Sequence, residues 1–193
     1  MRASTILVSG FLSAAAFLAL APSAEARPTI KNPNDHPQYR AELEPHANFI
    51  LWHGRYHSKY GRYRSFGDPE LGAGFRATIE LGDPAFIPKI NNTVGITFGI
   101  DITNCRYCYH DRYHEDFTFW TPVGLQWNFF LTDKWSVFGE GGLMLRSLGF
   151  YSYTDVDFFV EAGGRFHFSD KVSLTMRIGS PFVSIGVSFF VGD

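Results

Sequence analysis

From Tyr39 to the end of the chain, apolar and polar residues alternate with a period of two. This period is typical of β-strands whose two faces meet different surroundings, and no helical period of 3.6 residues competes with it. In residues 70–81, ELGAGFRATIEL, the apolar side chains share one face, and glutamate, glycine, arginine and threonine share the other. We predict eight such strands, at residues 39–51, 70–81, 93–102, 117–131, 135 onward, 156–168, 172–178 and 182–191.

The connections between the predicted strands differ in length. The turns at 132–134 and 169–171 are tight, whereas the connections after the first three strands are long. Tight turns join antiparallel neighbours, and an eight-stranded sheet of such neighbours closes into a barrel that has no exposed edge. The predicted fold is therefore all-β, a closed eight-stranded antiparallel up-and-down barrel.

The composition of the polar face indicates that it lies inside the barrel. Lysine is absent from the polar faces of the strands, although a sheet face in water normally carries it. The lysines beyond residue 26 lie in the leader, loops and turns: Lys31, Lys59, Lys89, Lys134 and Lys171. Glycine recurs on the polar face, where it makes room in a narrow lumen. Charges of both signs, which can neutralise one another there, form the predicted lumen network: Glu42, Glu44, Arg76, Glu140, Glu161, Arg165 and Arg177.

The register of one hairpin makes this network specific. If the turn at 169–171 is tight, Arg177 falls opposite Gly163, between Glu161 and Arg165. Ion pairs are then expected inside the barrel, together with aromatic side chains that fill the remaining space. A lumen plugged in this way should conduct little. The aromatic residues expected there are Trp120, Phe138 and Phe159.

The apolar face has the features of a surface that meets lipid. Between the strand ends it carries essentially no charge, and an arginine or lysine turned to lipid at the midplane would cost about 2–4 kcal/mol. Membrane barrels place large aromatic residues at the two interfaces, and the candidates near strand ends are Tyr39, Trp52, Trp127 and Trp135. We therefore predict a transmembrane barrel. A soluble lipocalin-like carrier, with the apolar face turned inward, is the alternative.

The first 26 residues have the features of a cleavable signal peptide. Arg2 precedes an apolar run, residues 6–20, that is shorter than the roughly 20 residues of a spanning helix. A small-x-small pattern, residues 24–26, follows it. The predicted organisation is a signal peptide at 1–26, an extended leader at 27–38 and an outer-membrane barrel at 39–193. The formal net charge of −2 provides no field that would attract nucleic acid.

The chain resembles the small eight-stranded bacterial outer-membrane β-barrels of the OmpX and OmpA-transmembrane-domain type. The resemblance covers residues 39–191 and is most specific in the last strand, where Gly186, Phe189 and Val191 look like the C-terminal signal read by the barrel-assembly machinery. The chain departs from the family in ending Val-Gly-Asp instead of a terminal phenylalanine. The resemblance implies outer-membrane lipids and lipopolysaccharide as surroundings. It also implies an N-terminus and tight turns that face the periplasm, and we expect a monomer.

Residues 105–116, CRYCYHDRYHED, form the second loop at the outer end. A disulfide between Cys105 and Cys108 would close the loop tip and stabilise the fold by about 2 kcal/mol at most. Alternatively, His110 and His114 join the two cysteines in a zinc or copper site, because thiolate and imidazole suit these metals. No second CxxC or HxxxH motif completes a known metal module, and a thioredoxin-like site needs a βαβ context that is absent. We expect no metal and no cofactor.

The first outer loop, residues 53–66, interleaves tyrosine with four cations. Arginine forks and aromatic stacking suit lipopolysaccharide phosphates or sugars, whereas a solvated, tyrosine-rich rim would have the same composition. The candidate binding residues are Arg55, Lys59, Arg62 and Arg64.

The sequence is compatible with three functions, two of them in a membrane and the third that of the soluble carrier. The first is a structural or surface-interaction barrel, and the second is a lipid A-modifying enzyme, a deacylase or acyltransferase. Such an enzyme needs a nucleophile or base with an orienting partner. His46 and His167 lie on polar faces beside acids, but neither stands in a recognisable Ser-His-acid motif. We therefore predict no catalytic residues.

Overall fold

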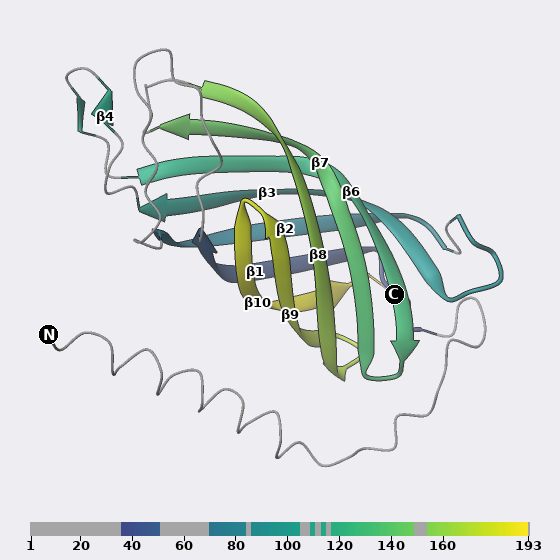
Figure 1. Ribbon diagram of the computed structural model, residues 1–193. Coiled ribbons are helices and arrows are strands. Elements are labelled where there is room, and N and C mark those ends of the chain that lie inside the picture. The colour runs from purple at the N-terminus through teal and green to yellow at the C-terminus, as the bar shows by residue number, and fades with distance from the viewer. Residues whose placement is uncertain are drawn as a thin grey trace, which may run out of the picture.

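The computed structural model describes residues 36–50, 70–83, 86–104, 109–110, 113–114, 117–148 and 154–192. Eight strands form one closed antiparallel barrel in which neighbours along the chain are neighbours in the sheet (Figure 1). They are β1 (Ala41–Ile50), β2 (Glu70–Gly82), β3 (Asn92–Asn104), β6 (Phe117–Thr132), β7 (Trp135–Leu148), β8 (Thr154–Ser169), β9 (Val172–Ser180) and β10 (Phe182–Val191). Pairing of β1 with β10 closes the barrel. The predicted closed eight-stranded antiparallel barrel is confirmed, and the predicted signal peptide lies outside the described residues.

A small separate hairpin interrupts the order between β3 and β6. It consists of β4 (Tyr109–His110) and β5 (Tyr113–His114). Figure 1 shows it at the opposite end of the barrel from the β6–β7 turn. No helix among the described residues is long and apolar enough to cross a membrane.

Short polar side chains form the two tight turns. The Thr132 hydroxyl accepts hydrogen bonds from the backbone N–H groups of Lys134 and Trp135, at 3.2 and 3.0 Å. In the β8–β9 turn, the Ser169 hydroxyl accepts one from the Lys171 N–H at 3.3 Å. Hydroxyl groups at such positions offer the backbone an alternative to the strand ladder. Both turns reverse the chain within two residues, as the sequence predicts.

The orientation of the two faces follows the prediction. Leu71, Phe75 and Val160 point outward, with 53%, 42% and 69% of their surfaces exposed. Glu140 and Arg165 point inward and are only 4% and 1% exposed. The apolar face is therefore the outer surface of the barrel, and the polar face lines the lumen.

The wall of the barrel is uneven in height. β6 and β8 each have 16 residues, whereas β9 and β10 have nine and ten. The pairing of β8 with β9 starts at Val160 and Ser180, so the residues of β8 before Val160 extend past the end of β9. There, the N–H groups of Val156 and Phe158 donate to the carboxylates of the preceding residues, Asp155 and Asp157, at 2.9 and 2.8 Å. Charged side chains on an unpaired strand edge protect it from further pairing.

One predicted position is wrong. Tyr39, expected in an aromatic girdle on the outer face, is 5% exposed and packs edge-to-face on Phe190 inside the barrel end. β1 begins only at Ala41, so the strand alternation that would direct Tyr39 outward does not extend to it. Of the other girdle candidates, Trp135 is 47% exposed and Trp127 is half-buried. Trp52 lies outside the described residues.

Candidate functional site

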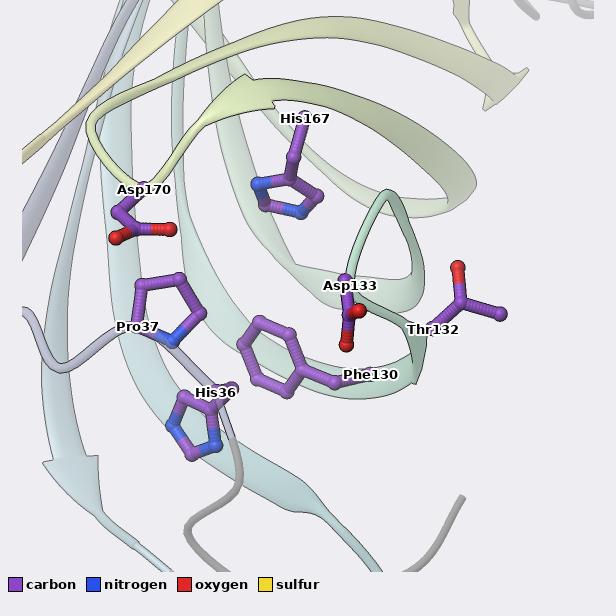
Figure 2. Close-up of a pocket in the computed structure, with 7 residues that line it drawn as sticks. All are labelled: His36, Pro37, Phe130, Thr132, Asp133, His167 and Asp170. Carbon is purple, nitrogen blue, oxygen red and sulfur yellow. The ribbon is translucent and has the colours of Figure 1, made fainter. Parts of the chain in front are cut away.

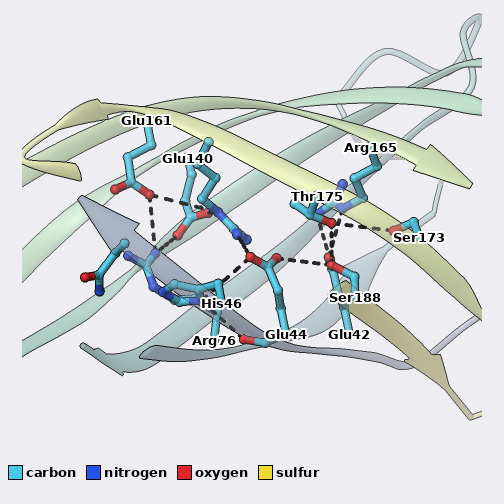
Figure 3. A network of polar contacts seen from close by, with 12 residues as sticks. Glu42, Glu44, His46, Arg76, Glu140, Glu161, Arg165, Ser173, Thr175 and Ser188 are labelled. Carbon is cyan, nitrogen blue, oxygen red and sulfur yellow. Dashed lines mark hydrogen bonds and ion pairs between the residues drawn. The ribbon is translucent and has the colours of Figure 1, made fainter. Parts of the chain in front are cut away.

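The lumen is the most strongly charged region that the structure describes, and its centre is organised around Glu140. Arg76 Nη1 lies 2.5 Å from Glu140 Oε1, and Arg177 Nε donates to Glu140 Oε2 at 3.3 Å. Gln126 Nε2 also donates to Oε2, at 3.2 Å. Arg177 reaches Glu44 on the opposite side through its Nη1. Figure 3 labels Glu44, Arg76 and Glu140 of this cluster, whose members come from β1, β2, β6, β7 and β9.

Arg165 organises a second cluster closer to the tight turns. Its Nε and Nη2 donate to the two carboxylate oxygens of Glu42 at 2.8 and 2.6 Å, a bidentate ion pair. Its Nη1 donates to Asn128 Oδ1, and Nη2 also donates to Gln126 Oε1, both at 2.9 Å. Every terminal nitrogen of this buried guanidinium thus has an acceptor, as a buried charge requires.

The Phe138 ring separates and supports the two clusters. The guanidinium carbons of Arg165 and Arg177 lie 4.0 and 4.9 Å from its centroid. At these distances the negative face of the ring attracts both cations. The ring can occupy this place because Gly163 faces it: a Cβ on Gly163 would lie 2.1 Å from Phe138 Cζ. Gly163 and Arg177 are cross-strand partners, as the sequence predicts.

His46 belongs to the polar interior, next to Asp101. Its Nε2 lies 2.6 Å from Asp101 Oδ1, which also accepts a hydrogen bond from Asn48 Nδ2 at 2.8 Å. Arg76 Nη2 approaches the other oxygen of Asp101 at 3.5 Å. A Cβ on Gly74 would lie 2.1 Å from Asp101 Oδ1, so only glycine leaves space for this pair. The imidazole is therefore held inside a charge network.

His167 lies near the tight turns, and its partner is a residue that the sequence did not single out. Its Nε2 is 2.8 Å from the hydroxyl of Ser136, which is fully buried. Its Nδ1 has no hydrogen-bond partner among the described residues. A catalytic triad needs an acid at that nitrogen. In the described part of the chain, no acid is hydrogen-bonded to the imidazole of this serine–histidine pair, and the serine is buried.

The buried acids outnumber the buried arginines. Glu42, Glu44, Asp101, Glu140 and Glu161 are buried, against Arg76, Arg165 and Arg177. Glu161 faces Glu140 directly across the β7–β8 pair, and neither of its carboxylate oxygens has a hydrogen bond in the described part of the chain. Its nearest cation is Arg76 Nη1, at 3.5 Å. The predicted lumen network, with four glutamates and three arginines, already has a surplus of acid, and the buried Asp101 increases it.

Beyond the charges, two clusters of aromatic and apolar side chains are buried in the lumen. Towards the long loops, a buried cluster comprises Ile50, Trp120, Met144, Phe159 and Phe182. Towards the tight turns, another comprises Tyr39, Phe130 and Phe190. Burial, and then the charge of Glu42, raises the pKa of Tyr39 above its usual range, so its phenol stays neutral. The aromatic residues predicted to fill the lumen are all buried: Trp120, Phe138 and Phe159.

A pocket of about 330 Å³ opens at the end of the barrel that carries the tight turns (Figure 2). His36 stacks on Phe130 inside it, with ring centroids 4.1 Å apart. The β6–β7 and β8–β9 turns contribute Asp133 and Asp170, and β8 contributes His167. The sequence did not indicate this pocket, because its lining comes from three segments that are far apart in the chain.

The remaining candidate residues have the following places. All seven residues of the predicted lumen network are buried in the interior. In β10, Gly186 faces inward opposite His46, while Phe189 and Val191 are each 43% exposed on the outer face. Among the described residues, no group of three or more histidine, cysteine, aspartate or glutamate side chains could hold a metal ion. The cysteine pair, Cys105 and Cys108, and the basic first loop lie outside the described residues.

No protein-family model matches this sequence, and no curated protein matches it. Solved structures of Ail, the attachment invasion locus protein of Yersinia pestis, have a similar architecture. The crystal structure of Ail is 12% identical in sequence, with a TM-score of 0.45, and the match covers 80% of this chain and 98% of Ail. For the backbone structure of the outer membrane protein Ail in a phospholipid bilayer nanodisc, identity is 10% and the TM-score 0.47, with 79% and 99% covered.

Proposed function

We propose that this chain is an integral outer-membrane β-barrel protein with a structural or surface-interaction role and a largely closed lumen. The observation that carries the proposal is the division of the barrel wall into an apolar outer face and a charged inner one. Twenty-five large apolar side chains are exposed on the described residues. Soluble monomers rarely expose apolar patches larger than a few hundred Å², so a lipid environment accounts best for this surface.

The positions of charged residues support the same proposal. The described lysines, Lys89, Lys134 and Lys171, all lie in connections between strands. A closed barrel also satisfies its backbone hydrogen bonds internally, which hydrocarbon requires of any spanning structure. A lipocalin-like carrier would need an apolar lumen for its ligand, whereas the described lumen is filled by ion pairs and aromatic rings.

The proposed topology places the tight turns and residues 36–40 in the periplasm and the long loops outside the cell. Export through a signal peptide at residues 1–26 and recognition of β10 by the barrel-assembly machinery are parts of this proposal. Lipopolysaccharide and other outer-membrane lipids are the proposed surroundings. Their phosphates and sugars are the proposed contacts of the first outer loop.

Membrane fractionation with protease shaving tests this proposal. The protein is expected in the outer-membrane fraction, soluble only in detergent and heat-modifiable on gels, and external protease should cut only in the long loops. Planar bilayers test the closed lumen, and only minimal conductance is expected. A chain that stays in the aqueous fraction without detergent would contradict the membrane assignment. A steady large conductance would contradict the closed lumen alone.

A further inference from the structure

The pocket at the tight-turn end has the composition of a binding site for an amine. Two acids from different turns, Asp133 and Asp170, line it together with His167 (Figure 2). Neither carboxylate has a hydrogen bond or ion pair with a described residue. Both acids are exposed, so holding them in one pocket leaves two negative charges available to a ligand from solution.

A buried polar atom without a partner points into the same space. His167 is 7% exposed, and its Nδ1 has no hydrogen bond within the described chain. Figure 2 shows its ring between Asp133 and Asp170, above Phe130. When Nε2–H donates to the Ser136 hydroxyl, 2.8 Å away, Nδ1 presents a lone pair to the pocket. A buried acceptor without a hydrogen bond destabilises the protein, so a ligand that donates a hydrogen bond to it gains affinity.

Ring side chains form much of the rest of the pocket. His36 and Phe130 form a stacked pair whose ring planes differ by only 8°. His36 Nδ1 is anchored 2.6 Å from Asn91 Oδ1, and Pro37 completes the wall. The cavity volume of about 330 Å³ lies at the lower end of the range for small-molecule sites. A short alkyl chain can therefore pack on the rings while its charged end reaches the acids.

We propose that this pocket binds an alkylammonium group, with the ammonium between Asp133 and Asp170 and His167 Nδ1 as a further acceptor. An ammonium carries three N–H donors on a compact charge, which matches three acceptors from two segments, Asp133 in the β6–β7 turn and His167 with Asp170 at the end of β8 and its turn. The group can come from a free diamine or from a lysine-like side chain of a periplasmic peptide. Lys134 is next to Asp133 in the sequence, so we expect its ammonium group to compete for the same charge.

Calorimetric titration of the full-length, refolded protein in uncharged detergent tests this site. Cadaverine should bind saturably at low ionic strength, and pentanediol, which has the same chain without charge, should not. The double variant D133N/D170N should weaken cadaverine binding about tenfold or more, since it removes both charge-assisted contacts. H167F should weaken it by a smaller factor, and K134Q should tighten it.

The matched control is D155N/D157N, which removes the same charge at the other end of β8. Equal weakening by the two double variants would overturn the site, because it would show attraction by net charge alone. Binding of pentanediol as tightly as cadaverine, or no saturable binding of cadaverine, would overturn it as well. Heat-modifiability confirms folding of each variant. N-acetyl-lysine methylamide identifies the source: binding supports a peptide side chain, and exclusion with retained cadaverine binding supports a free diamine.

Discussion

At the scale of single residues, Glu161 sets the charge balance of the lumen. It is 3% exposed and faces Glu140, yet only Glu140 has the full set of hydrogen bonds from Arg76, Arg177 and Gln126. A buried charge is tolerated when it is paired and hydrogen-bonded, and is costly otherwise. We therefore expect these two glutamates, which are cross-strand partners, to have opposite effects on stability.

We expect Glu161→Gln to raise the free energy of unfolding by about 1–3 kcal/mol. It keeps the shape of the side chain and removes a buried charge that has no hydrogen bond among the described residues and only longer ion-pair contacts, at 3.5 and 4.0 Å, with Arg76 and Arg177. Urea titration of the folded, heat-modifiable band in detergent measures this change. Glu140→Gln is the matched control, and it should lower the stability by about 3–5 kcal/mol because it leaves two arginines without their shared partner. Destabilisation of similar size in both variants would contradict the distinction between the two acids.

At the scale of elements, the packing of β7 against β8 depends on the pairing of a glycine with an aromatic ring. Phe138 and Gly163 are cross-strand partners, and the ring occupies the space that a Cβ on Gly163 would take. Arg165 and Arg177 lie over the same ring, so it cannot move without disturbing both charge clusters. Glycine is thus required at position 163 because the Phe138 ring lies where any larger residue would place its Cβ.

Gly163→Ala should lower the free energy of unfolding by about 1–3 kcal/mol, the usual cost of overpacking a filled interior. Gly139→Ala on the neighbouring strand is the control, since a Cβ there would meet nothing within 4 Å and its effect should be small. The same urea titration compares the two variants. Phe138→Leu should recover part of the loss when combined with Gly163→Ala, and a failure to do so would contradict the proposed clash.

At the scale of the whole molecule, the apolar outer face determines which surroundings the barrel can occupy. If this face meets lipid, the cost of a charge on it depends on depth in the bilayer. Phe98 lies midway along β3, and Phe168 lies at the tight-turn end of β8; they are 42% and 64% exposed. These two positions therefore sample the midplane and the interface.

Phe98→Arg is expected to cost about 2–4 kcal/mol of folding free energy in lipid vesicles, whereas Phe168→Arg should cost about 0–1 kcal/mol. Reversible unfolding in guanidinium with vesicles present, followed by tryptophan fluorescence, measures both. Equal costs at the two positions would contradict a membrane-spanning wall. The comparison does not depend on the closed lumen or on any ligand.

The proposed surface role predicts binding by the first outer loop. Replacing its four cations, Arg55, Lys59, Arg62 and Arg64, by alanine should weaken co-sedimentation of the refolded protein with lipopolysaccharide aggregates by several-fold. The physical reason is the loss of arginine and lysine contacts to phosphate. The control variant carries Lys134→Ala and Lys171→Ala at the other end of the barrel. Unchanged binding by the loop variant would contradict this contact surface.

Much of the fold could be predicted because strand alternation is a local property. The boundaries of β10 and the start of β6 and β7 agree with the sequence prediction, as does the pairing of Gly163 with Arg177. Tyr39 could not be placed, because its direction depends on where β1 begins and on the space beside Phe190. The pocket could not be predicted either. In the sequence its two acids are ordinary turn residues, and only the folded chain brings the three segments that line the pocket together.

The sequence by itself therefore determined which side chains face the lumen and which face outward, because a period of two fixes the side of the sheet for each residue. Only the tertiary structure decided which side chains contact one another in the lumen. Arg165 pairs with Glu42, 123 positions away in the chain, and Glu161 has no side-chain hydrogen bond with any described residue. These outcomes depend on the closure and stagger of the whole barrel, which bring together residues from strands that are not neighbours.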